Sequence, residues 1–249
     1  LERHINWRLY HETSGGLMTE LASHQLDVAT WILDAMPTRV WGYGGIDYWR
    51  DGREVFDNVN LVYEYVTTPE NRGFKKIKEP RTKFQDVNKC NEAYKLRLCY
   101  SSICGNAMRG CSELIQGDRG TFDLTEGRCL FYPEAVATVK WIDKAQRAED
   151  DPNAIIITSG GTLNLSTQKR KDAKPINVNT DKTVDQLQFE AFADDIKKGG
   201  APKANVMVGL KGAVCALAGM IAMREEREVV IDPAWYTFDF KTPDTSMYS

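Results

Sequence analysis

A series of short strand-like segments lies between two helical regions, and this order restricts the chain to few folds. The segments are rich in aromatic or β-branched residues and are separated by turn residues. The expected strands are residues 38–49, 58–66, 94–103, 107–116, 121–124, 128–132 and 136–141. Tight turns between consecutive strands favour antiparallel pairing. The sequence therefore predicts an α+β domain with an open, mostly antiparallel β-sheet and helices packed on one face.

Helical periodicity marks three stretches outside the strands. The first, residues 14–34, begins with a Gly pair and is ended by Pro37, which cannot continue a helix. The second, residues 183–198, ends at a Gly pair of the kind that caps helices. The third, residues 205–228, is rich in Ala and Gly and therefore allows close packing against a neighbour; a short strand at 229–231 follows it.

The composition is that of an ordinary globular protein. Among 249 residues, 42% are hydrophobic and 27% charged, which suffices for a sizeable core. We expect one domain over residues 1–249, with polar loop insertions at 67–92 and 144–183. A net charge of −3 gives no reason to expect a nucleic acid or an anionic membrane as partner.

The chain shows neither a membrane span nor a secretory segment. Its longest apolar run, residues 213–223, is too short to cross a bilayer. The opening residues LERHINWRLY are typical of the middle of a domain, so we expect a preceding segment, and a signal peptide there stays open. The six cysteines form no Cys-x-x-Cys pair, so no metal site is expected and the thiols are interpreted as reduced and buried. A cytoplasmic location is favoured, with a periplasmic one as the alternative.

Three residues of the first helix could perform chemistry together. At about 100° per residue, Glu20, His24 and Asp27 fall on one stripe, next to the apolar side of the helix. An imidazole between two carboxylates is either a proton-handling site or a salt-bridged helix surface. The spacing alone leaves both interpretations open.

This stripe resembles a known motif. Gly15-Gly16 with Glu20, His24 and Asp27 is similar to the G-G-x(3)-D-x(3)-H-x(2)-D pattern in the C-terminal, substrate-binding domain of the Gfo/Idh/MocA family of NAD(P)-dependent oxidoreductases. Three further stretches agree with the family in the same order: TRVWGYGG from residue 38, QGDRGTFDL from residue 116, and residues 188–231.

The resemblance implies a function and a set of site residues. The expected activity is oxidation of a hydroxyl on a sugar, a sugar derivative or a cyclitol, with His24 as proton relay and Glu20 holding its imidazole. Asp27 would bind a second hydroxyl. The segment before the helix would bring Trp7, Arg8 and Tyr10 to the substrate. The family also implies a homo-oligomer formed through the open sheet face, where Trp41, Tyr43, Tyr48 and Trp49 are expected to lie.

The chain departs from the family pattern in two ways. The dinucleotide fingerprint G-x-G-x-x-G and the Glu-Lys-Pro motif with the catalytic lysine are absent; Gly42–Gly45 and Lys78–Pro80 are only partial matches. The chain therefore resembles a substrate domain without its Rossmann domain. NAD or NADP is expected in the full-length protein, whereas the fragment alone is expected to bind neither and to be inactive. The second departure is Glu20, where the family usually has Asp.

Two alternative functions remain open at this point. A glycosidase of the same family, which oxidises, eliminates and re-reduces its substrate with the nicotinamide, would use the same residues. A sugar-binding or assembly module without catalysis would keep the fold but not the cofactor.

Overall fold

The computed structural model describes residues 1–71, 78, 86–106, 110–117, 120–125, 128–133, 155–156, 182–199 and 202–237. Its contacts divide the chain into two compact units, where the sequence predicted a single domain. One unit comprises Leu1–Asn106 and Lys203–Ser249, and the other comprises Ala107–Pro202. The expected strand at 136–141 and most of the two expected insertions lie outside the described residues.

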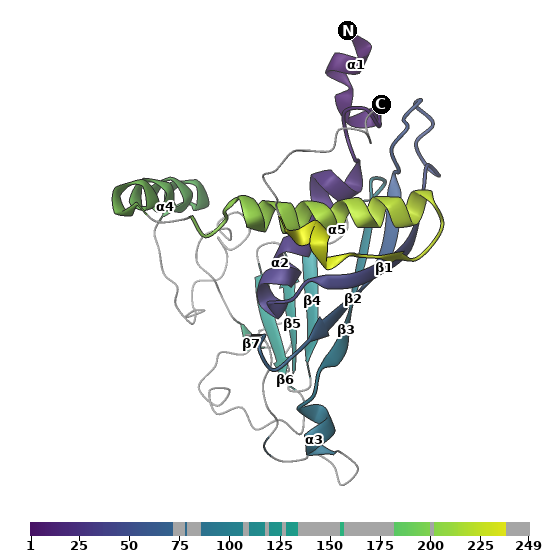
Figure 1. Cartoon of the computed structure of the whole chain (residues 1–249). Coiled ribbons are helices and arrows are strands. Elements are labelled where there is room, and N and C mark those ends of the chain that lie inside the picture. The colour runs from purple at the N-terminus through teal and green to yellow at the C-terminus, as the bar shows by residue number, and fades with distance from the viewer. Residues whose placement is uncertain are drawn as a thin grey trace. The chain divides into compact units, whose positions relative to one another are not determined.

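The described elements follow the predicted order of helix, strands and helices (Figure 1). The helices are α1 (Glu2–Ile5), η1 (Trp7–Leu9), η2 (Met18–Ala22), α2 (Ser23–Leu33), α3 (Val87–Cys90), α4 (Val184–Lys198), α5 (Val206–Arg224) and η4 (Pro233–Tyr236). The strands are β1 (Pro37–Gly45), β2 (Asn58–Thr67), β3 (Tyr94–Ile103), β4 (Ser112–Gly117), β5 (Gly120–Thr125), β6 (Arg128–Pro133), β7 (Ile155–Ile156) and β8 (Val229–Val230). The predicted α+β class with antiparallel strands is confirmed.

The first unit contains a four-stranded antiparallel sheet in the order β3-β2-β1-β8. β1 and β2 pair as the expected hairpin, from Gly45 opposite Asn58 to Val40 opposite Tyr63. The short strand β8, which follows α5, returns to pair with the other edge of β1. The segment after α5 therefore forms one edge of this sheet.

The second unit contains a separate four-stranded antiparallel sheet, in the order β4-β5-β6-β7. The strands expected on either side of Gly105-Asn106 both form, but they belong to different sheets. β3 pairs over ten residues with β2, which is equally long. This pairing is long-range, because the two strands are far apart in the sequence. α4 begins at the N-cap Thr183, whose hydroxyl accepts from Gln186 N, and ends at Gly199 in the left-handed conformation, as the sequence predicted.

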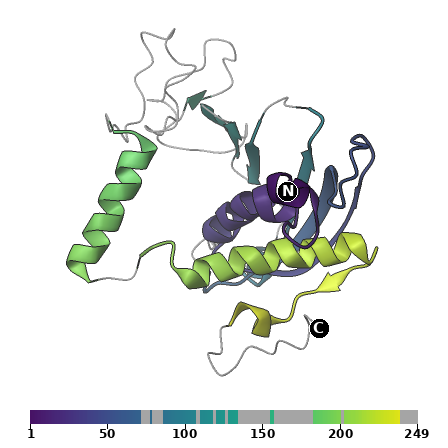
Figure 2. The same cartoon turned by 90° about the horizontal axis from the view of Figure 1, so that it is seen from above.

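Helices α2 and α5 lie side by side and cover one face of the first sheet (Figure 2). Alternate residues of β1 and β2 point into this core, as the period of a strand requires. The largest core side chains include Met18, Leu26, Tyr63 and Tyr65, and the hydroxyl of Tyr63 donates to the carbonyl of Cys215 at 3.0 Å. The small residues of α5 thus allow large aromatic residues to fit beneath it.

By length and composition α5 could cross a bilayer, since its mean hydropathy reaches 1.9. No other helix in the described part of the chain could do so. Here α5 serves as a core helix, because Cys215, Ala218, Gly219 and Ala222 are almost fully buried against the sheet and its neighbours. A core helix of a globular unit meets the same criterion, so the membrane is not needed to explain this composition.

Gly219 shows how closely α5 approaches the sheet. A Cβ atom at this position would lie 2.8 Å from Leu61 Cδ2 and 2.9 Å from Met18 Cε. We therefore expect Gly219→Ala to lower the free energy of unfolding by about 1–3 kcal/mol through overpacking. Gly209→Ala is the matched control in the same helix, because nothing lies within 4 Å of its added Cβ, and it should raise stability by about 1 kcal/mol. Denaturant unfolding measures both, and equal effects would contradict this packing.

Aromatic side chains are exposed on the opposite face of the first sheet, which we call the open face. Trp41 and Tyr43 of β1 are 44% and 57% exposed there, with their rings in edge contact at a centroid distance of 4.9 Å. Tyr48 and Trp49 lie in the loop after β1 and not on the strand. Glu64 also points to the open face, where it is paired with three cationic side chains, Arg39, Lys95 and Arg97. Oligomerisation through this face stays a prediction.

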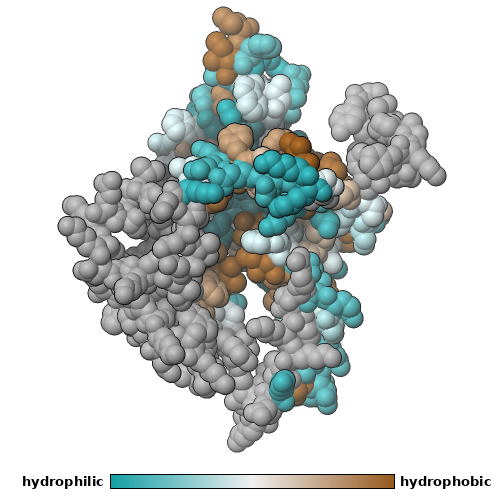
Figure 3. Space-filling view, turned by 90° about the vertical axis from the view of Figure 1, so that its left-hand side faces the viewer, coloured by the Kyte–Doolittle hydropathy of each residue, from teal (hydrophilic) through white to brown (hydrophobic). Residues whose placement is uncertain are grey.

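Three of the four free cysteines whose exposure the structure describes are exposed. Cys99, Cys104 and Cys111 are free and exposed, so the expectation of buried thiols is wrong for them, whereas Cys215 is free and buried. Cys99 lies in β3, whereas Cys104 and Cys111 lie directly after β3 and directly before β4. The face drawn in Figure 3 shows hydrophobic residues in separate groups among hydrophilic ones. Apolar atoms make up about 55–60% of the accessible surface of a folded protein, so exposed groups of this kind are normal.

Candidate functional site

The helix that carries the motif begins irregularly. Gly16 has a left-handed φ of 60°, and its backbone N–H donates to Ser14 Oγ at 2.9 Å. Residues Met18–Ala22 then form a π-helical turn before the regular helix α2 begins at Ser23. A π turn is wider than an α turn, and such turns occur frequently at functional sites. The even 100° steps assumed for Glu20 and His24 therefore do not hold across this turn.

Glu20 binds the segment before the helix. Arg8 Nε donates to Glu20 Oε2 at 3.0 Å, and Ser14 Oγ donates to Glu20 Oε1 at 3.2 Å. The guanidinium of Arg8 also stacks on the ring of Trp7, with its carbon 4.3 Å from the ring centroid. No hydrogen bond between Glu20 and His24 is present among the residues that the structure describes. Glu20 thus ties residues 7 and 8 to the start of the helix instead of holding the imidazole.

Tyr10 and His11 contact other groups. The guanidinium of Arg3 lies 4.7 Å from the centre of the Tyr10 ring. His11 Nδ1 lies 2.6 Å from Nη2 of Arg224, at the end of α5. Burial and the nearby Arg224 lower the pKa of His11, while Glu54 acts in the opposite direction. The neutral imidazole is therefore the form that can accept the hydrogen bond from Arg224.

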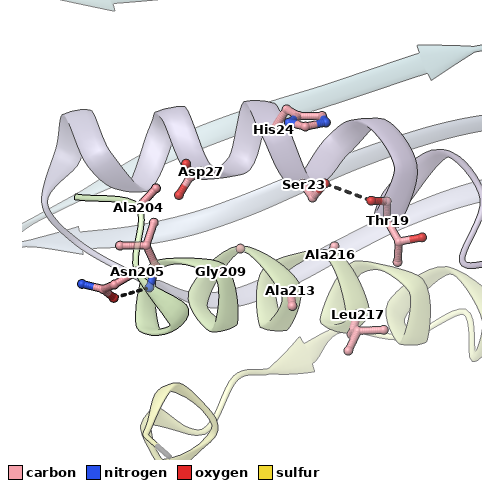
Figure 4. A pocket seen from close by; sticks show the side chains of 12 residues that line it. Thr19, Ser23, His24, Asp27, Ala204, Asn205, Gly209, Ala213, Ala216 and Leu217 are labelled. Carbon is pink, nitrogen blue, oxygen red and sulfur yellow. Dashed lines mark hydrogen bonds between the residues drawn. The ribbon is translucent and has the colours of Figure 1, made fainter. Parts of the chain in front are cut away.

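A cavity of about 480 Å³ lies between α2 and α5, within the usual size range of small-molecule sites (Figure 4). Its polar lining comes mainly from the motif helix. The lining residues are Thr19, Ser23, His24, Asp27, Ala204, Asn205, Val208, Gly209, Gly212, Ala213, Ala216 and Leu217. All of them belong to the first unit.

The polar side chains differ in their direction and in their partners. In Figure 4, Ser23 and Asp27 point from α2 toward α5, whereas the ring of His24 lies at the edge of α2 away from α5. Ser23 Oγ donates to Thr19 O at 2.9 Å. Asn205 Oδ1 caps α5 by accepting from the backbone N–H of residues 207 and 208. Within the described ranges, neither His24 nor the Asp27 carboxylate has a hydrogen bond or an ion pair.

The predicted site residues thus fall into two groups. His24 and Asp27 line the cavity, but Glu20, Arg8, Trp7 and Tyr10 do not. Arg8 contacts both Trp7 and Glu20. Sequence reasoning missed the lining residues Thr19, Ser23, Asn205, Gly209 and Gly212. For Asn205, Gly209 and Gly212 the available signal was the Gly- and Ala-rich sequence of α5, which was interpreted only as a sign of close packing.

The described residues allow two candidate sites to be tested, a metal site and a phosphate loop at Gly42–Gly45. No group of three or more His, Cys, Asp or Glu side chains within them could hold a metal ion. Gly42–Gly45 lie inside β1 and pair with β2, so they are not a phosphate loop before a helix. These glycines therefore do not offer a helix N-terminus to the pyrophosphate of a nicotinamide dinucleotide.

The sequence matches one family model over part of its length. Residues 2–68 match the GFO/IDH/MocA C-terminal domain. This range includes the whole motif helix and the β1–β2 hairpin. No curated protein matches the chain.

Solved structures extend the fold similarity to most of the chain. An oxidoreductase domain protein from Kribbella flavida shares 13% identity at a TM-score of 0.57, with 91% of this chain and 53% of that chain covered. An aldose–aldose oxidoreductase from Caulobacter crescentus, complexed with glycerol, shares 16% identity at a TM-score of 0.52, with 90% of this chain and 50% of that chain covered. A levoglucosan dehydrogenase in complex with NADH and L-sorbose shares 13% identity at a TM-score of 0.56, with 91% of this chain and 53% of that chain covered. The chain thus has their fold and spans about half of their length.

Proposed function

We propose that the chain belongs to the GFO/IDH/MocA C-terminal domain family, whose model matches residues 2–68, and that it is the substrate-binding part of an NAD(P)-dependent oxidoreductase. The substrate would be a sugar, a sugar derivative or a cyclitol, oxidised at a hydroxyl. The observation that carries the proposal is the α2–α5 cavity, which His24 and Asp27 of the family motif line together. The sugar-oxidising activities named for two solved structures of the same fold support it.

His24 has the chemistry that this reaction needs from the chain. Oxidation of an alcohol removes a hydride from carbon and a proton from oxygen, and histidine is suited to the proton because it titrates near neutral pH. The imidazole of His24 is exposed and unpaired among the described residues, so both ring nitrogens are accessible to a substrate hydroxyl. In this proposal His24 accepts the proton and Asp27 binds a neighbouring hydroxyl.

The nicotinamide would accept the hydride, but Gly42–Gly45, the partial match to its fingerprint, lie inside β1 and form no phosphate loop. The proposal therefore places it on another domain, in agreement with the length of the solved structures, of which this chain covers about half. The Trp7–Arg8–Glu20 contact adds a positioned guanidinium and an indole face next to the motif helix. Such groups bind hydroxyl oxygens and the C–H face of a sugar.

Titration of the 249-residue chain tests the proposal. We expect isothermal titration to show weak binding of at least one of D-glucose, levoglucosan and myo-inositol, and NADH fluorescence to stay unchanged on addition of the chain. Asp27→Ala should abolish the sugar signal, whereas Asp185→Ala, an exposed aspartate outside the cavity, should leave it intact. A chain that binds none of these sugars, or that binds NADH, contradicts the proposal.

A further inference from the structure

The segment before the motif helix, residues 2–13, is attached to α5 through the ring of a histidine. His11 Nδ1 lies 2.6 Å from Nη2 of Arg224, the last residue of α5. A guanidinium can only donate a hydrogen bond, so the imidazole has to be neutral to accept it. We propose that this contact is a pH-sensitive switch: protonation of His11 breaks it and loosens the segment.

A second contact attaches the same segment to the loop between β1 and β2. Glu54 Oε2 accepts from the backbone N–H of His11 at 2.9 Å, and the backbone N–H of Glu54 donates to the carbonyl oxygen of Leu9 at 2.7 Å. Neither bond requires a neutral imidazole. The segment is thus held at two points, and loss of the contact at Arg224 raises the fraction of time for which the contact at Glu54 is open.

The charges that act on the His11 ring come from two elements. Arg224 lies on α5 and Glu54 in the β1–β2 loop, while Glu12 on the segment itself is paired with Arg3, which also lies 3.6 Å from Glu54. A cavity of about 10 Å³ beside the His11–Arg224 pair has room for at most one water molecule, so little solvent can separate two cations there. Its other lining residues are glycine or apolar: Gly15, Leu17, Met18, Val55, Phe56, Val59, Met220 and Met223.

The direction of the pH dependence follows from the charges around the ring. Burial and Arg224 lower the pKa of His11 from the ordinary 6.5, and Glu54 only partly opposes them. When the segment detaches, the pKa of His11 returns toward 6.5, so the detached form binds protons more readily than the attached form does. The attached form is therefore favoured fully above pH 6.5 and loses stability as the pH falls below this value.

The switch is connected to the motif helix through Arg8. This residue belongs to the segment, stacks on Trp7 and donates to Glu20 at 3.0 Å. On the basis of the proposed function, Trp7 and Arg8 contact the sugar, so acidification would weaken sugar binding by loosening them. Only this consequence rests on the proposed function, because the switch itself needs no ligand.

Amide hydrogen exchange of the 249-residue chain without sugar, followed by NMR, tests the switch. The probe is the backbone N–H of Glu54, which donates to Leu9 in the segment. As the pH falls from about 7.5 to about 5.5, we expect its protection in the wild-type chain to drop about two- to fivefold relative to His11→Gln, the range expected for a contact between exposed side chains. Glutamine keeps an acceptor for Arg224 but does not titrate. The matched control His4→Gln, in the exposed helix α1, should follow the wild-type chain.

A second variant tests the same switch from the side of α5. In Arg224→Gln the pKa of His11, measured by NMR titration of the ring, should rise toward 6.5, and the pH dependence at Glu54 should disappear. Equal pH dependence in the wild-type chain and in His11→Gln, or an unchanged His11 pKa in Arg224→Gln, overturns the switch and leaves the proposed function intact. Unchanged exchange of the β2 amides in every variant shows that the fold is retained.

Discussion

His24→Ala is expected to reduce the rate of sugar oxidation by roughly 10²–10⁴-fold, the usual contribution of a positioned general acid or base. The measurement uses the chain together with the nicotinamide-binding domain that the proposed function requires, because Gly42–Gly45 form no phosphate loop. The loss should fall mainly on kcat, since the imidazole takes the proton in the transition state, whereas binding of the substrate also depends on Asp27 and the cavity.

The control for His24 is His4→Ala. His4 is exposed in the short helix α1 and does not line the cavity, so its removal should leave turnover unchanged. His24→Gln keeps hydrogen bonding but cannot act as a base near neutral pH, and it should be as inactive as the alanine variant. Full turnover by either His24 variant would refute the assignment of proton transfer to this residue.

Asp57→Ala is expected to lower the free energy of unfolding by about 2–4 kcal/mol, because several donors would lose one buried charged acceptor. Asp57 is 1% exposed and directly precedes β2, at the end of the loop that joins β1 to β2. Its carboxylate accepts from the backbone N–H groups of Asp47, Tyr48 and Trp49 at 2.8–3.2 Å, and from the side-chain amide of Asn58 at 3.0 Å. The carboxylate therefore fixes the loop that joins β1 to β2.

The same carboxylate makes part of the stability dependent on pH. Burial acts to raise the pKa of Asp57, but the hydrogen bonds from Trp49, Asn58, Asp47 and Tyr48 outweigh it and lower the pKa from the ordinary 3.8 to about 2. The stabilisation is therefore complete above pH 4 and is lost as the pH falls toward 2. Denaturant unfolding should show the difference between the wild-type protein and Asp57→Asn shrinking over this interval.

The control for Asp57 is Asp51→Asn. Asp51 lies in the same loop and is exposed, and its carboxylate pairs with Arg53 at 2.7 Å. The Asp51 carboxylate is open to solvent and holds only Arg53, two residues away, so this variant should lose much less stability than Asp57→Ala does. An effect as large as that of Asp57→Ala would contradict the structural role assigned to the buried carboxylate.

Much of the fold could be predicted because it depends on local patterns. The limits of β3 and α4 and the start of α5 agree with the sequence interpretation, since alternation, Thr183, Gly199 and Asn205 each act within a few residues. The predicted end of the last helix at Glu228 is wrong, because α5 ends at Arg224. The division of the strands between two sheets was not predicted. The pairing partner of β3 depends on contacts between distant parts of the sequence. The Gly105-Asn106 turn beside it is compatible with pairing to β2 or to β4.

The sequence alone determined the chemistry available on the motif helix. The spacing of His24 and Asp27 places them three residues apart on one helix, and the structure finds both on the same cavity. The tertiary structure decided the rest. The π turn at Met18–Ala22 and the approach of Arg8 gave Glu20 a different partner from the one expected, because a partner twelve residues away is set by chain folding and not by helical spacing. The packing of α5 beside α2 brought Asn205 and Gly209 to His24 and Asp27, and so created a cavity that no single segment encodes.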